Sequence, residues 1–243
     1  MARSRIDLGE TRGTLIPMFW QDDNEEQYTV SDEIVDLVCT IRCRSLPNDH
    51  AQALAEALLE HAAWLATDAG AGVHPISIQE AANGWMRPEG PDELIHLSRR
   101  TKLILRAPQQ RLADSEELIG KPLEVDGNPF EIQKIETRQL QPSETLFSRY
   151  NIVAEGQDED DFLQAVFDAL KAMGISPRKM LPGKGRRLRG PDGVLHTSSL
   201  MVAELRPEES ITLQQRGIGE HQHLGCGLFI PHKGIREVHD LEG

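Results

Sequence analysis

The feature that most constrains the fold of this chain is a hydrophobic period that switches between two and about 3.6 residues, and does so twice. From Val35 to Ile41, apolar residues alternate with other residues, which is typical of a half-buried strand. Apolar residues at helical spacing then run from Ala51 to Leu65, after a turn at Pro47. We therefore expect a strand over 35–41 and a helix over about 49–67.

The same alternation of strands and helices continues to the end of the chain. In the first half it predicts strands at 73–79, 93–98 and 101–107, a helix near 110–118, and a hairpin turn at Asp126-Gly127. In the second half it predicts a strand at 146–153, a helix over 162–173, a strand at 195–205, a helix from Pro207 to Gly217, and a last strand at 226–230. This order predicts an α+β protein made of two tandem ferredoxin-like (RRM-like) domains.

The expected domain boundaries follow from that order and from local composition. We expect an acidic N-terminal arm at 1–32, one ferredoxin-like domain at 33–142 and a second at 143–243. The segment 178–193 is too rich in glycine for a helix and too basic for a core, which predicts a flexible basic loop. A second, glycine-rich loop is expected at 217–227.

Charge is distributed unevenly along the chain. The formal net charge of -13 argues against a nucleic-acid partner, because Lys and Arg supply most of the affinity for phosphates. However, residues 1–33 and 155–161 each carry -5, so the remainder carries about -3. Residues 97–111 and 178–190 contain five and six basic residues, and neither segment contains an acid. Segregated cations of this kind favour an anion-binding surface.

Composition also bears on where the protein works. No apolar run approaches the roughly 20 residues that span a bilayer, and no apolar segment of a secretory signal follows Arg3 and Arg5. The three cysteines, at 39, 43 and 226, form no CxxC pair. We expect a soluble protein of the reducing cytoplasm, with no membrane partner.

Glycines bracket a short turn in the segment GIGEHQHLGCG at 217–227. Glycine permits a positive φ, and successive exposed N–H groups can then form a concavity for phosphate oxygens. The alternative is a tight connection between a helix and a strand. The segment is neither a Rossmann fingerprint, since it follows a helix and precedes a strand, nor a P-loop, since no Gly-Lys-Ser/Thr ends it.

Four segments in combination resemble one known family. They are VDLVCTIRCRSLPNDHAQAL at 35–54, GVHPI at 72–76, LIHLSRRTKLILRAP at 94–108 and LQQRGIGEHQHLGCGLFIP at 213–231. The chain resembles the CRISPR-associated repeat-RNA endoribonucleases, the "Cas six" group of the RAMP superfamily, and in particular their Myxan subtype, over about 34–233. The resemblance implies two ferredoxin-like domains and cleavage of precursor CRISPR RNA within each repeat, without metal, by a protein that often stays bound to its product. The acidic arm and the low overall charge depart from the basic profile of that family.

Metal-free RNA cleavage needs a base for the ribose 2′-hydroxyl, an acid for the 5′-oxygen and cations for the crowded phosphate. His50 matches the family's histidine in LPxDH and is our candidate acid or base, although a first-turn histidine on its own is more often a solvated surface residue. Arg44, together with Arg42, could stabilise the phosphorane, although both arginines also suit exposed strand positions. Tyr150 could act as an acid or stack on a base, although a tyrosine on an alternating strand more often packs. His74 and His96 rank after His50.

The predicted RNA-binding residues come from the basic segments and the glycine-rich loop. They are Arg99, Arg100, Arg106, Arg178, Lys179, Lys184, Arg186, Arg187, Arg189, Gly217, Gly219, His221, His223, Gly225 and Gly227. A metal site at His221, His223 and His232 is disfavoured because no carboxylate or thiolate completes it, and no cofactor is expected. The sequence thus predicts a CRISPR repeat-RNA endoribonuclease that works with other surveillance-complex subunits. The alternative is a subunit of such a complex that binds crRNA without cutting it.

Overall fold

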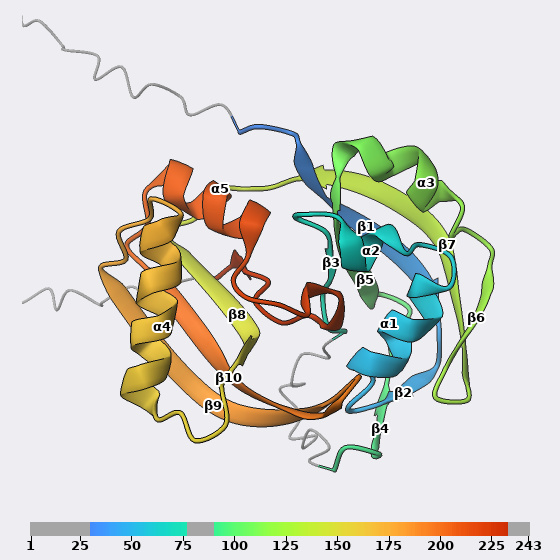
Figure 1. Ribbon diagram of the computed structural model, residues 1–243. Coiled ribbons are helices and arrows are strands. Elements are labelled where there is room, and N and C mark those ends of the chain that lie inside the picture. The colour runs from blue at the N-terminus through green and yellow to red at the C-terminus, as the bar shows by residue number, and fades with distance from the viewer. Residues whose placement is uncertain (1–29, 77–89, 233–243) are drawn as a thin grey trace, which may run out of the picture.

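The computed structural model describes residues 30–76 and 90–232, in which two antiparallel sheets each carry helices on one face (Figure 1). The elements of the first half are β1 (Ile34–Arg42), β2 (Ser45–Pro47), α1 (Ala51–Leu59), α2 (Trp64–Thr67), β3 (Gly72–Val73), β4 (Leu94–His96), β5 (Lys102–Pro108), the 3-10 turn η1 (Gln109–Arg111), α3 (Leu112–Glu116), β6 (Pro122–Val125) and β7 (Asn128–Gln139). Those of the second half are β8 (Thr145–Ile152), α4 (Glu159–Ala172), β9 (Lys179–Gly190), β10 (Gly193–Ala203), α5 (Pro207–Arg216), the 3-10 turn η2 (Gln222–Leu224) and β11 (Ile230–Pro231).

Both sheets have ferredoxin-like topology, as the order of elements predicts. In the N-terminal sheet the strands lie in the order β3-β5-β1-β7-β6, and in the C-terminal sheet in the order β11-β8-β10-β9. In each case the first strand lies between the third and the last, and the second strand is next to the third. The turn between β6 and β7 has positive φ at Asp126 and Gly127, which confirms the predicted hairpin.

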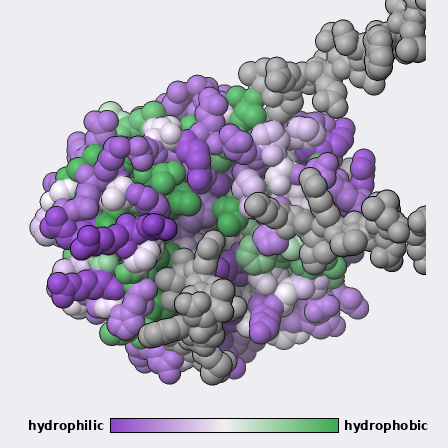
Figure 2. Space-filling view, turned by 180° about the vertical axis from the view of Figure 1, so that it is seen from behind, coloured by the Kyte–Doolittle hydropathy of each residue, from purple (hydrophilic) through white to green (hydrophobic). Residues whose placement is uncertain are grey.

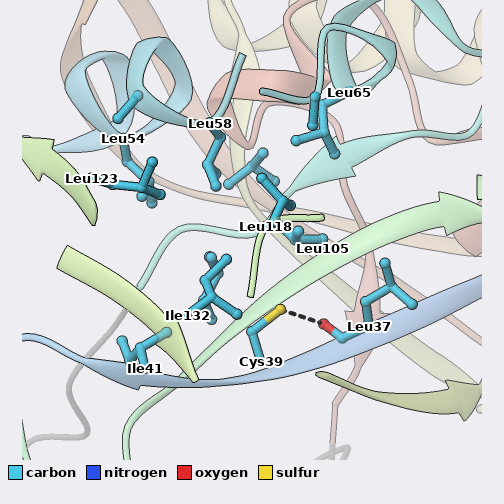
Figure 3. Close-up of a cluster of buried hydrophobic side chains, with 14 of the residues drawn as sticks. Leu37, Cys39, Ile41, Leu54, Leu58, Leu65, Leu105, Leu118, Leu123 and Ile132 are labelled. Atoms are coloured by element: carbon cyan, nitrogen blue, oxygen red, sulfur yellow. Dashed lines mark hydrogen bonds between the residues drawn. The ribbon is translucent and has the colours of Figure 1, made fainter. Parts of the chain in front are cut away.

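Each sheet has its own core. In the N-terminal one, the alternating residues of β1 face the leucines of α1, as Figure 3 shows for Leu37, Cys39 and Ile41 opposite Leu54 and Leu58. The core of the C-terminal sheet lies between its strands and helices α4 and α5, and is formed by Leu146, Phe162, Val166, Leu170, Ile175, Leu200, Val202, Leu205, Leu213 and Phe229. The alternation that predicted these strands is therefore the pattern of burial.

A third apolar cluster joins the two halves. Ala55 of α1 packs with Tyr150 of β8, Leu188 of β9, Leu224 of η2 and Cys226 of the glycine-rich loop. Helix α1 thus contacts the face of the C-terminal sheet that α4 and α5 leave open. Because α1 carries His50 at its start, this contact positions the candidate catalytic residue against the second domain.

Several predicted elements differ from the structure. The predicted basic loop at 178–193 is wrong, since β9 pairs with β10 from Lys179 to Gly190. The helix predicted over 49–67 divides into α1 and α2, because the N–H groups of His61 and Ala62 both donate to the carbonyl of Leu58 and tighten the turn. The last strand, predicted at 226–230, is present only as β11. The strand predicted at 73–79 is reduced to β3, and residues 77–79 lie outside the described residues.

The back of the molecule is mostly hydrophilic, with hydrophobic side chains in small separate patches (Figure 2). Among the described residues, no helix is long and apolar enough to cross a membrane. The predicted arm at 1–32 lies outside the described residues except for positions 30–32.

Candidate active site and nucleic-acid interface

His50 lies in the turn between β2 and α1, where it is the N-cap residue of the helix. Two backbone bonds hold this turn against the segment before β4: Asn48 N–H donates to the Glu93 carbonyl (2.8 Å), and Asp49 N–H donates to the Pro91 carbonyl (3.0 Å). The Nδ1 atom of His50 is 2.8 Å from the carbonyl oxygen of Pro47. Since a carbonyl only accepts, Nδ1 carries the hydrogen, and Nε2 is the nitrogen of the neutral ring that can take a proton.

The imidazole of His50 is only 4% exposed, so it is not the solvated surface residue that a first-turn histidine usually is. Asp49 beside it is also buried, and its Oδ2 atom accepts a hydrogen bond from the backbone N–H of Arg189 at 2.9 Å. Burial raises the pKa of the Asp49 carboxyl, against the opposing effect of Arg189. Asp49 is not among the predicted site residues, although it directly precedes His50 in LPNDH.

Arg189 links the two domains beside His50. Its guanidinium pairs with Asp126 (3.3 Å) in the β6–β7 turn and with Asp92 before β4. The predicted role of Arg189 as a ready phosphate contact therefore needs correction, because in this conformation its charge is shared with two carboxylates of the N-terminal domain. The side chain remains 44% exposed, so phosphate oxygens can reach it.

Arg106 is a second correction. It was predicted to bind RNA, but its side chain is fully buried and bonded to Asp36 (3.1 Å). Its Nη1 atom also donates to the carbonyls of Gln214 (2.7 Å) and Phe229 (2.9 Å) in the C-terminal domain. The alternation of apolar residues over 102–108 does not predict this burial, because it arises where the second domain covers the open face of the sheet. Arg106 joins the domains and cannot reach a phosphate in this fold.

His74 belongs to the same buried network. Its Nε2 atom is 4.0 Å from Asp36, and burial, together with the Arg106 charge, lowers the pKa of His74 to about 3. Burial alone would raise the pKa of Asp36, but Arg106, His74 and Arg138 together lower it. His74, a second-ranked catalytic candidate, therefore lies in the buried network through which Arg106 joins the two domains.

Tyr150 and Arg44, the two weaker catalytic candidates, lie in different surroundings. Tyr150 is 5% exposed and packs in the cluster between the domains, which agrees with the packing role that an alternating strand favours for a tyrosine. Arg44 is exposed just before β2, whereas His50 comes three residues after that strand ends. Arg44 lines a separate pocket of about 480 Å³ with Arg42. His96 of β4 is exposed and pairs with Ser45 of β2.

The glycine-rich loop turns most of its N–H groups inward. Gly217, Gly219, Gly225 and Gly227 all have positive φ, as the sequence predicts. However, the N–H groups of residues 218, 226 and 227 donate to the carbonyls of Gly227, His221 and Tyr150, so they form no phosphate cradle. The tight connection between elements is the better description of this loop.

The outer side of that loop carries two histidines. His221 and His223 line a pocket of about 700 Å³ with Arg216, and their ring centroids are 5.7 Å apart. Burial, with a smaller effect of His221, lowers the pKa of His223. Within residues 30–76 and 90–232, no three His, Cys, Asp or Glu side chains are placed to hold a metal ion together.

Strand β9 is the most basic exposed element of the described chain. Lys179, Lys184 and Arg187 are exposed along it, Arg186 is half-buried, and Arg178 is exposed just before it. Arg186 and Arg187 line a pocket of about 430 Å³ next to the start of α4. Arg99 and Arg100 are exposed in the turn between β4 and β5. These cations are placed on the surface, where they can contact phosphates.

Comparison with known proteins now decides the family. The family model "Cas6 Crispr" matches residues 35–234. The CRISPR-associated endonuclease Cas6 of Myxococcus xanthus (strain DK1622) is 30% identical over 197 residues, which cover 81% of each protein. The chain belongs to the Cas6 family.

Solved structures agree with this fold. A Cas6-related protein of Pyrococcus furiosus matches with a TM-score of 0.55 at 15% identity, over 84% of this chain and 99% of that one. A second structure, described as CRISPR associated protein Cas6, matches with a TM-score of 0.56 at 10% identity, over 83% of this chain and 100% of that one. At these identities the likeness supports the tandem ferredoxin-like fold of the Cas6 family and no more.

Proposed function

We propose that this Cas6 protein is a metal-independent endoribonuclease that binds CRISPR repeat RNA and cuts precursor crRNA, with His50 as a proton-transfer group. The observation that carries the proposal is the bond from His50 Nδ1 to the Pro47 carbonyl at 2.8 Å. It fixes the ring so that Nε2 can remove a proton from a ribose 2′-hydroxyl or, once protonated, donate one to the 5′-oxygen. The 30% identity to the CRISPR-associated endonuclease Cas6 of Myxococcus xanthus supports the proposed endonuclease activity.

In the proposed reaction the 2′-oxygen attacks the adjacent phosphorus while its proton passes to a base. The bond from phosphorus to the 5′-oxygen breaks, and that oxygen takes a proton from an acid. The products carry a 2′,3′-cyclic phosphate and a 5′-hydroxyl. These steps need no metal to generate the nucleophile, since the 2′-hydroxyl is already present in the substrate.

The phosphate undergoing attack needs a cation beside His50. Arg189 is the best-placed candidate, because its backbone N–H is bonded to Asp49, the neighbour of His50. Its guanidinium would exchange Asp92 and Asp126 for phosphate oxygens when RNA binds. Arg44 precedes β2, whereas His50 follows it, and Arg44 lines a separate pocket with Arg42, which favours a role in binding rather than in the chemical step.

The exposed cations supply the RNA-binding surface in this proposal. Strand β9 presents Lys179, Lys184 and Arg187 on the same strand as Arg189. Because β9 packs against α1, RNA held along β9 would pass close to His50. We expect the protein to keep its product and to act with other subunits of a CRISPR surveillance complex in the cytoplasm.

One observation favours the alternative function, a crRNA-binding subunit without catalysis. His50 is 4% exposed, and a catalytic base must reach its substrate. In the enzyme, RNA binding would have to uncover Nε2, whereas a subunit that only holds RNA would need no such change.

The test uses repeat RNA from the CRISPR array of the source genome. We expect wild-type protein to cut it in excess EDTA and to leave 2′,3′-cyclic phosphate and 5′-hydroxyl ends, identified by mass spectrometry. A single 2′-deoxy substitution at the nucleotide before the cut should block cleavage and leave binding intact. A strict requirement for Mg²⁺ would reject this mechanism, and tight binding without any cleavage would favour the alternative.

A further inference from the structure

The C-terminal sheet has an apolar row on its open face, outside the contact with α1. The register of the strands places Ile230 opposite Phe147, Phe147 opposite Met201, and Met201 opposite Leu181. Directly opposite residues share a face, so these four side chains cross all four strands in a line. Their sequence neighbours Leu146, Leu200 and Phe229 are buried under α4 and α5, which puts the row on the other face.

The row is open to solvent at both edges of the sheet. Leu181 on β9 is 47% exposed and Ile230 on β11 is 39% exposed, while Phe147 and Met201 between them are half-buried. The contact with α1 covers the same face only at its other end, around Leu188. From Leu188 to Leu181 the chain runs seven residues along β9, or about 20 Å.

An aromatic pair stands at the centre of this row. The rings of Phe147 and His232 lie with centroids 5.7 Å apart at 48°. The backbone N–H of His232 donates to the carbonyl of Thr145 at 3.0 Å, which fixes the residue after β11 beside β8. Phe147 lies on β8, one of the two central strands of the sheet.

Cations and small polar residues border the row. On β9, Lys179 lies two residues from Leu181 on the same face, opposite Ala203, which in turn pairs with Thr145 of β8. On the other side of the row, Arg149 follows Phe147 by two residues on β8, where the register with β10 shifts. Among the strand positions on this face that the structure describes, from Thr145 to Arg149, Ser199 to Ala203 and Lys179 to Gly183, none is acidic. An apolar protein partner would favour a wider patch, whereas a narrow aromatic strip between cations suits a single strand of nucleic acid.

We propose that this face is a second RNA-binding site, where unpaired bases stack on Phe147 and His232 while Arg149 and Lys179 contact the phosphates. Four-stranded sheets of this topology bind single-stranded RNA through aromatic side chains on their central strands, because every base has a face that can stack. The site is on the same face of the same sheet as the α1 contact, so RNA that leaves the His50 region along β9 reaches it. The inference deepens the proposed function by assigning a place to unpaired RNA next to the cut.

The experiment measures binding of a 5′-fluorescein 12-nucleotide oligouridine by fluorescence anisotropy at low salt. Phe147→Leu keeps an apolar side chain and removes the ring, so it should weaken oligouridine binding about 5- to 100-fold, the range for loss of a stacked base. Phe147→Trp should restore binding, since it restores stacking. Phe167→Ala is the matched control, because Phe167 is 36% exposed on α4, away from this face.

Thermal unfolding checks that each variant is folded. Binding of oligouridine by Phe147→Leu within twofold of wild type overturns the proposal and leaves the row as a protein-binding surface. The result is independent of the chemical step, since oligouridine binding is scored without cleavage. If His50→Ala cuts repeat RNA normally while Phe147→Leu loses oligouridine, the proposed mechanism fails and the second site stands.

Discussion

His74 carries no charge at neutral pH in this fold, since burial and the Arg106 guanidinium lower its pKa to about 3. It is a catalytic candidate by sequence because it lies in a segment that resembles the family, although a histidine before a proline is also common at structural corners. Only the three-dimensional contact with Asp36 separates these two interpretations. His50 is different, since its ring is fixed by a neighbour three residues away, which LPNDH encodes locally.

His74 predicts how stability depends on pH. The unfolded chain binds a proton at His74 near pH 6.5, whereas the folded chain binds it only near pH 3. Between these values the unfolded state holds more protons, so the free energy of unfolding falls as pH falls, by about 1.4 kcal/mol per pH unit for this group.

The measurement is urea unfolding of wild type and His74→Gln from pH 4 to 7. Because the variant lacks this titration, the difference between the two proteins should shrink or change sign as pH falls below 6.5. A difference that stays constant between pH 4 and 6.5 would show that His74 is not held neutral by the fold.

Strand β9 is an element that local sequence patterns do not predict. It has three glycines and Pro182, and its apolar residues do not alternate regularly, so its local signals are those of a loop. Its edge position explains why these residues are tolerated, since an edge strand is paired on one side only. The order of elements in a ferredoxin-like domain did require a strand between α4 and β10, which was the available signal.

The exposed cations of β9 give a binding prediction. Lys184→Glu combined with Arg187→Glu should weaken binding of repeat RNA and reduce the slope of log K against log salt by about 1.4 to 1.8, because each phosphate contact contributes about 0.7 to 0.9. Lys121→Glu with Lys134→Glu makes the same change of charge on exposed residues of the N-terminal domain and serves as the control. Equal effects of the two pairs would mean that net charge, and not β9, governs binding.

The glycine-rich turn predicts a contrast between two substitutions. A Cβ at Gly227 would lie 1.7 Å from the Ile218 carbonyl oxygen, whereas a Cβ at Gly219 would meet nothing within 4 Å, and both residues have positive φ. Gly219→Ala should cost about 1 to 2 kcal/mol from backbone strain alone. Gly227→Ala should cost at least twice as much, since the backbone must also move.

Urea unfolding of the two variants measures this contrast. Equal losses of stability would contradict the inward packing of the loop, and with it the conclusion that the loop is a structural connection.

At the scale of the whole molecule, the fold follows from sequence and the arrangement of the domains does not. Alternating apolar residues and turn signals predicted most strands and helices, because these patterns are local. The bonds from Arg106 to the carbonyls of Gln214 and Phe229 join residues more than 100 positions apart, and no local pattern encodes them. The same holds for Asp49 and Arg189, so the surroundings of His50 required the structure.

The central claim is that His50 transfers a proton during RNA cleavage, and His50→Ala tests it most directly. The measurement is single-turnover cleavage of repeat RNA in EDTA, with the affinity of the same RNA measured in parallel. We predict a loss of rate of at least about a hundredfold, with affinity within a few-fold of wild type, because a general acid or base acts mainly in the transition state. Cleavage at the wild-type rate by His50→Ala would contradict the account.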